Sequence, residues 1–143
     1  MRIASIVALC LMVVAAPAQD VPNPGFEDGA AGDPDGWSLN QGTGAWEMDG
    51  RDGGRCISVT GGGDNEASNF WLTDDLVFKP GETYRISLWM KVALGTSGGT
   101  IMTGPSFANR DYGCGETWEE KSFVFAVPEE PGNSGYLRFG QWE

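Results

Sequence analysis

The chain has 143 residues, 22 of them glycine, with 20 Asp and Glu against 9 Lys and Arg and no His. That length suits one domain with a single core, and a net charge of −11 disfavours nucleic acid and anionic membranes as partners, leaving neutral ligands or calcium. The lack of histidine excludes Ser-His-acid and Cys-His catalysis, and so short a chain rarely forms the deep cleft that carboxylate catalysis needs. We therefore expect no enzyme.

The first residues have the features of a secretory signal peptide. Arg2 precedes an apolar run over residues 3–15, which is too short to cross a bilayer, and residues 16–18 (Ala-Pro-Ala) provide a cleavage site. We expect residues 1–18 to be removed and residues 19–143 to form one secreted domain, extracellular or periplasmic.

Short strands are predicted throughout the remaining chain, because no helix-length amphipathic stretch follows Gln19 and Gly, Pro, Asp and Asn recur at short intervals. The segment 83–92 shows the clearest alternation of apolar and polar residues, with Trp89 on the polar side. The predicted strands cover residues 56–59, 69–72, 76–78, 83–92, 118–127 and 136–139. About eight short strands without helices predict an all-β fold, with two antiparallel sheets packed face to face.

Two cysteines, Cys56 and Cys114, lie beyond the predicted signal peptide. In an exported protein such a pair favours one disulfide. The alternative is two separate thiols, with Cys56 buried in an apolar strand. We expect the bridge.

Several short motifs occur in the order typical of a known family. They are Asn-Pro-Gly-Phe-Glu at 23–27, Pro-Asp-Gly-Trp at 34–37, Gly-Arg-Cys-Ile-Ser-Val at 54–59, Pro-Gly-Glu-Thr-Tyr-Arg-Ile-Ser-Leu-Trp-Met-Lys at 80–91, and Thr-Trp at 117–118 before Phe123 and Phe125. Over about residues 21–143 the chain resembles the CenC-type carbohydrate-binding modules, jelly-roll sandwiches of the galactose-binding-like group. Such modules end in a strand with an Asp-Asp-aliphatic sequence, and none follows Trp142. We therefore expect the domain to be truncated before its last strand.

The resemblance also implies a structural calcium ion. The family binds it through the Glu of the Gly-Phe-Glu motif, groups near the Gly-to-aliphatic strand and an Asp of the missing strand. Glu27 matches the first position, and Asp49 or Asp52 lies near the second. Calcium takes about six to eight oxygen ligands, so an incomplete set would bind it weakly.

Sugar recognition needs an exposed aromatic ring, on which the weakly apolar face of a pyranose stacks, and polar side chains for the hydroxyls around it. Trp71 is the first candidate, beside Asn69, because the resemblance places a binding aromatic on this strand. The alternative is a core tryptophan, with Phe70 then facing outward, because neighbours in a strand face opposite sides.

A second aromatic and a basic residue are implied by the resemblance near residues 109–113, where Tyr112 and Arg110 lie in a polar loop. The alternative is that this loop only makes a turn. Trp89 stands opposite the apolar row of its strand and is either an exposed platform or cover for the other sheet.

We expect a secreted, non-catalytic module that binds polysaccharide through aromatic stacking, as a monomer. Two alternatives stay open. One is the N-terminal fragment of a glycoside hydrolase or other secreted hydrolase, and the other is a structural or adhesive cell-surface sandwich with no sugar site.

Overall fold

The computed structural model describes residues 20–60, 69–74, 76–95, 101–105, 107–131 and 135–141. The predicted signal peptide, the glycine-rich stretch 61–68 and Trp142 lie outside these residues. Within the described ranges, none of the helical structure is long and apolar enough to cross a membrane.

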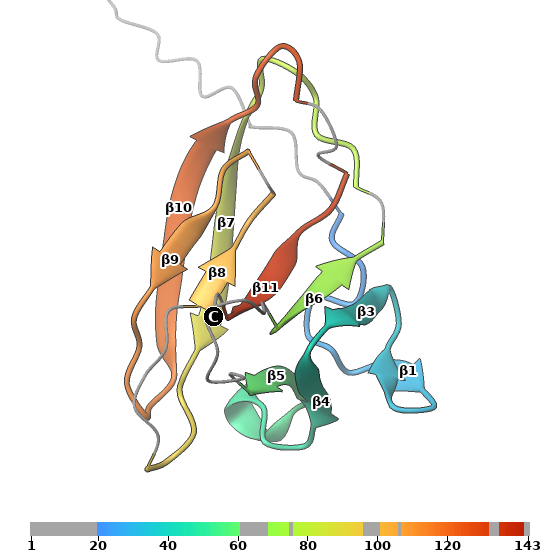
Figure 1. Cartoon of the computed structure of the whole chain (residues 1–143), viewed down its shortest axis with the longest axis vertical. Coiled ribbons are helices and arrows are strands. Elements are labelled where there is room, and N and C mark those ends of the chain that lie inside the picture. The colour runs from blue at the N-terminus through green and yellow to red at the C-terminus, as the bar shows by residue number, and fades with distance from the viewer. Residues whose placement is uncertain are drawn as a thin grey trace, which may run out of the picture.

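The described chain is built almost entirely of short strands, which confirms the predicted all-β fold (Figure 1). In chain order the elements are β1 (Gly29–Ala30), β2 (Asp33–Pro34), β3 (Trp37–Gln41), β4 (Thr43–Glu47), the 3-10 turn η1 (Arg51–Gly53), β5 (Cys56–Thr60), β6 (Asn69–Thr73), β7 (Thr83–Met90), β8 (Ile101–Thr103), β9 (Arg110–Tyr112), β10 (Glu119–Ala126) and β11 (Arg138–Gln141). The predicted strand at 76–78 is wrong. Leu76 and Phe78 are buried there, but no ladder is assigned to them.

Five strands form the largest sheet, in the order β3-β6-β11-β8-β9, with every neighbouring pair antiparallel. A long ladder joins β7 to β10, and a hairpin joins β4 to β5. Figure 1 shows β4 and β5 lying at the lower end of β6. The ring of Tyr112 in β9 lies near that of Phe123 in β10, with centroids 6.3 Å apart. The two layers thus enclose one core.

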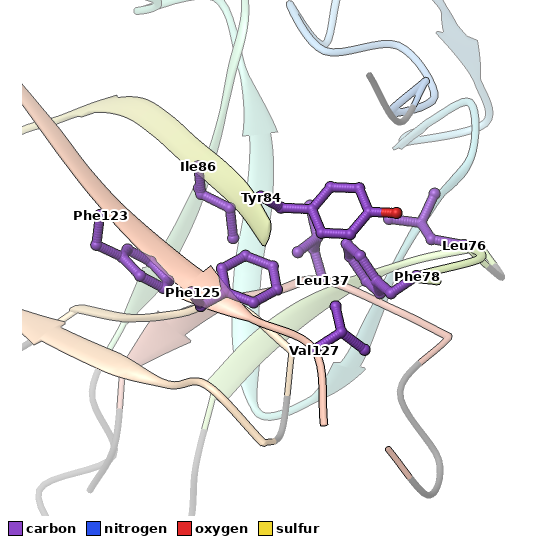
Figure 2. Packing of buried hydrophobic residues seen from close by; sticks show 8 residues of the cluster. All are labelled: Leu76, Phe78, Tyr84, Ile86, Phe123, Phe125, Val127 and Leu137. Atoms are coloured by element: carbon purple, nitrogen blue, oxygen red, sulfur yellow. The ribbon is translucent and has the colours of Figure 1, made fainter. Parts of the chain in front are cut away.

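The core lies between the β7–β10 ladder and the five-stranded sheet. Tyr84 and Ile86 of β7 face inward beside Phe123 and Phe125 of β10, as strand alternation dictates (Figure 2). The rings of Tyr84 and Phe125 stack with centroids 5.9 Å apart. Each such buried ring stabilises the fold by roughly 1.5–3 kcal/mol relative to an exposed one, so the core holds the two layers in a fixed relation.

Candidate functional site

The first two predicted sugar contacts, Trp71 and Asn69, lie on the inner face of β6. Only 2% of Trp71 and 3% of Asn69 is exposed. The expectation that Trp71 forms an exposed platform is therefore wrong, and the alternative holds: Trp71 is a core residue and Phe70 points the other way. A buried indole has no free face on which a sugar could stack.

Polar contacts explain why Trp71 and Asn69 face inward. The Trp71 indole N–H donates to the carbonyl of Ser58 over 2.9 Å, and the Asn69 Oδ1 accepts from the amide of Thr43 over 3.1 Å. The Asn69 amide nitrogen donates to the carbonyl of Thr60. Together these bonds attach the β4–β5 hairpin to β6, because each satisfies a polar group that burial would otherwise leave unpaired.

Tyr112 and Arg110 lie in strand β9, and the prediction of a loop at this place is wrong. Their partners in β8 are Ile101 and Thr103, and this register places both side chains on the side of the sheet that faces β10. The ring of Tyr112 is half-buried, with its centroid 6.3 Å from that of Phe123. The exposed guanidinium of Arg110 lies 5.7 Å from the Phe123 ring. The structure therefore places both residues at the margin of the core.

Trp89 is the predicted aromatic that the structure leaves exposed, with 40% of its surface open to solvent. It stands on the outer face of β7, directly opposite Glu120 of β10. The guanidinium carbon of Arg51 lies 3.7 Å from the centroid of the indole ring. Trp89 is thus exposed, while Arg51 covers one face of its ring.

The predicted disulfide does not form, because Cys56 and Cys114 are both free thiols in the structure. Cys56 opens β5 opposite Glu47, whereas Cys114 follows β9 and lies near Glu119. Burial raises the pKa of both thiols, and the nearby Glu47 and Glu119 carboxylates raise them further. Both cysteines are therefore expected to be protonated and slow to react at neutral pH.

The three carboxylates predicted for calcium do not form one site. Glu27 Oε1 accepts a hydrogen bond from the backbone amide of Arg55 over 2.9 Å. An Asp49 oxygen lies 2.7 Å from the Lys91 ammonium. An Asp52 oxygen lies 3.4 Å from the Arg51 guanidinium. No group of three or more His, Cys, Asp or Glu side chains suited to a metal occurs in the part of the chain that is described. This set does not fit an ion that takes about six to eight oxygens. Calcium binding itself stays a prediction.

A surface that the sequence analysis did not assign lies on the outer face of the five-stranded sheet. We call this surface the outer face of the five-stranded sheet. It consists of the backbone of Gly140 and the residues Ser38, Phe70, Leu72, Asp111 and Arg138. The register places Leu72 between Ser38 and Arg138, and Phe70 opposite Gly140. Gly140 pairs in turn with Met102 of β8, and Met102 pairs with Asp111 of β9, so Asp111 lies in the same row across the sheet as Phe70. The face thus combines apolar surface with a guanidinium, a carboxylate and a hydroxyl.

Two details position the side chains of this face. The Arg138 Nε donates to the Asn109 Oδ1 over 3.3 Å, which holds the guanidinium toward β9. A Cβ atom at Gly140 would lie 2.6 Å from the Cβ of Phe70, so only glycine fits beside the ring. The signal for Phe70 was present in the sequence, since it must face outward once Trp71 faces inward. The signal for Arg138 was its alternation with Leu137 and Phe139.

Comparison with known proteins identifies one family and one relative. Residues 19–141 match the family described as a carbohydrate binding domain. Colicin-A from Citrobacter freundii is 33% identical over 118 residues, which cover 78% of this chain and 19% of colicin-A. The chain therefore spans about a fifth of the length of that relative.

Proposed function

The chain belongs to the carbohydrate-binding domain family, and from this premise we propose that it is a secreted, non-catalytic module that holds polysaccharide on the outer face of its five-stranded sheet. The observation that carries the site is the outward position of Phe70, whose neighbours Asn69 and Trp71 are both buried. This gives the sheet a half-buried ring on its outer side, next to polar groups.

The chemistry of the outer face suits a pyranose. The ring of Phe70 offers an apolar surface for the axial C–H groups of a sugar, and it packs closely over the backbone of Gly140. Arg138 is the next residue of β11 on this face, two positions from Gly140 and roughly 7 Å along the strand. Its guanidinium donates to hydroxyl oxygens, while the carboxylate of Asp111 accepts from hydroxyl groups. A neutral polysaccharide lying across the five strands would meet all three groups.

The chemistry of the same face supports binding without bond cleavage. Glycoside hydrolysis usually needs a pair of carboxyl groups flanking the scissile bond. Among the described strand residues of the outer face, Asp111 is the only carboxylate. Contacts on an open sheet surface give modest affinity, in the micromolar range or about −8 kcal/mol.

The test is affinity electrophoresis in gels containing neutral polysaccharides, with a glycan array to extend the range of ligands. We expect Phe70→Ala to weaken binding about tenfold, the loss of one stacked ring, and Arg138→Ala to weaken it similarly. Val77→Ala is the matched control, because Val77 is an exposed apolar residue (71%) outside the five-stranded sheet. Thermal unfolding of each variant shows whether the fold persists.

Two outcomes would contradict the proposal. One is unchanged binding by a folded Phe70→Ala variant, which would move the site to another surface. The other is a wild-type domain that binds no glycan on the array, which would favour a structural sandwich.

A further inference from the structure

The outer face of the β7–β10 ladder forms a second polar surface with an exposed aromatic ring. We call it the ladder surface and define it by the outward residues of the two strands. These are Thr83, Arg85, Ser87 and Trp89 of β7 and Glu120, Ser122, Val124 and Ala126 of β10. All of them are exposed, whereas the residues between them face the core or its margin. The ladder surface and the outer face of the five-stranded sheet therefore look in opposite directions, with the core between them.

Trp89 has polar neighbours on three sides. Glu120 lies directly across the ladder. Ser87 and Ser122 form the next outward pair, roughly 7 Å along the strands from Trp89. From η1, a distant part of the sequence, the Arg51 guanidinium carbon lies over the ring, 3.7 Å from its centroid, and covers one of the two faces of the indole, so a sugar would stack on the other face. The exposed indole is thus surrounded by hydrogen-bonding groups of both kinds.

The charges of the ladder surface select the kind of ligand. The guanidinium groups of Arg51 and Arg85 are balanced by the carboxylates of Glu120 and Asp52, the latter 3.4 Å from Arg51. The surface therefore has no excess charge to attract an ionic partner, and the net charge of −11 repels polyanions at long range. Sugar hydroxyls donate and accept at once, so a neutral glycan can use the guanidinium donors and the carboxylate acceptors together.

We propose that the ladder surface is a second binding surface for neutral polysaccharide, with Trp89 as its stacking ring. The choice of a glycan as ligand rests on the proposed function, but the surface itself is separate from Phe70 and Arg138. Arg85 lies on the same face of β7, four residues from Trp89 and roughly 14 Å along the strand. This length of the ladder surface suits an extended polysaccharide chain. Because the two surfaces lie on opposite layers, one domain would hold two polysaccharide chains.

The test counts sites per chain by titration calorimetry. The probe is a soluble oligosaccharide of whichever neutral polysaccharide (cellulose, xylan or β-1,3-glucan) retains the wild-type domain in a gel. We expect two sites per chain in the wild type. Trp89→Ala should weaken one of them about tenfold, Phe70→Ala should weaken the other about tenfold, and the double variant should weaken both. Val77→Ala, which shortens an exposed apolar side chain outside both surfaces, should keep both sites. Circular dichroism confirms that each variant is folded.

The outcomes separate the two proposals. If calorimetry finds a single site whose affinity falls in Phe70→Ala but not in Trp89→Ala, the ladder surface alone is overturned. If the affinity of a single site falls only in Trp89→Ala, the ladder surface is supported and the site on the five-stranded sheet is overturned. Retention through Trp89 by alginate or polygalacturonate, but by no neutral glycan, would overturn the choice of a neutral ligand. Retention by none of these glycans would overturn the ladder surface as a sugar site.

Discussion

Replacing Trp71 with phenylalanine tests whether this residue belongs to the core or to a binding surface. The Trp71 side chain is 2% exposed, and its indole N–H donates to the Ser58 carbonyl. Phenylalanine keeps a ring but leaves that carbonyl without its partner, which costs about 1–3 kcal/mol. It also removes about two buried carbons, worth roughly 0.8 kcal/mol each. We therefore expect Trp71→Phe to lower the free energy of unfolding by about 3 kcal/mol.

Urea denaturation measures this loss directly. With an m-value of roughly 2 kcal/mol/M, the midpoint should fall by about 1.5 M. The matched control is Trp89→Phe, which changes an exposed ring in the same way and should alter stability by no more than about 0.5 kcal/mol. A Trp71→Phe midpoint equal to that of the control, together with lost glycan binding, would refute the buried position and restore Trp71 as a sugar contact.

Two further predictions concern the cysteines and one surface ion pair. Both Cys56 and Cys114 should titrate with a thiol reagent once the unreduced protein is unfolded; no reactive thiol before reduction would show that they are bridged after all. Hydrogen bonds from Lys121 and from the Gly115 amide lower the pKa of Glu119, so its contribution to stability is present at neutral pH and is lost as the pH falls through that lowered pKa. The wild type should therefore melt at a higher temperature than Glu119→Gln at neutral pH, and this difference should shrink as the pH drops below about 4.5 and in high salt. A difference that does not change with pH would show that the ionised Glu119 does not stabilise the fold.

The parts of the fold that the sequence determined are those with a local signal. In β7 every second residue is apolar, and the inward row of β10 holds Phe123 and Phe125, since a strand turns alternate side chains to opposite faces. The alternation therefore predicted both strands, their inward rows and the outward position of Trp89. The short polar strand β9 carries no such pattern, and it exists because its backbone pairs with β8.

The candidate site depended on choices that local sequence leaves open. Phe70 and Trp71 are adjacent and both apolar, so alternation allows either one to face the core. In the folded protein Trp71 faces inward, where its indole N–H donates to the Ser58 carbonyl of β5. The positions of Cys56 relative to Cys114 and of Glu27 relative to Asp49 likewise depend on how distant segments pack. Periodicity along one strand says which side chains share a face, but only the packing of strands from distant parts of the chain decides which face is covered.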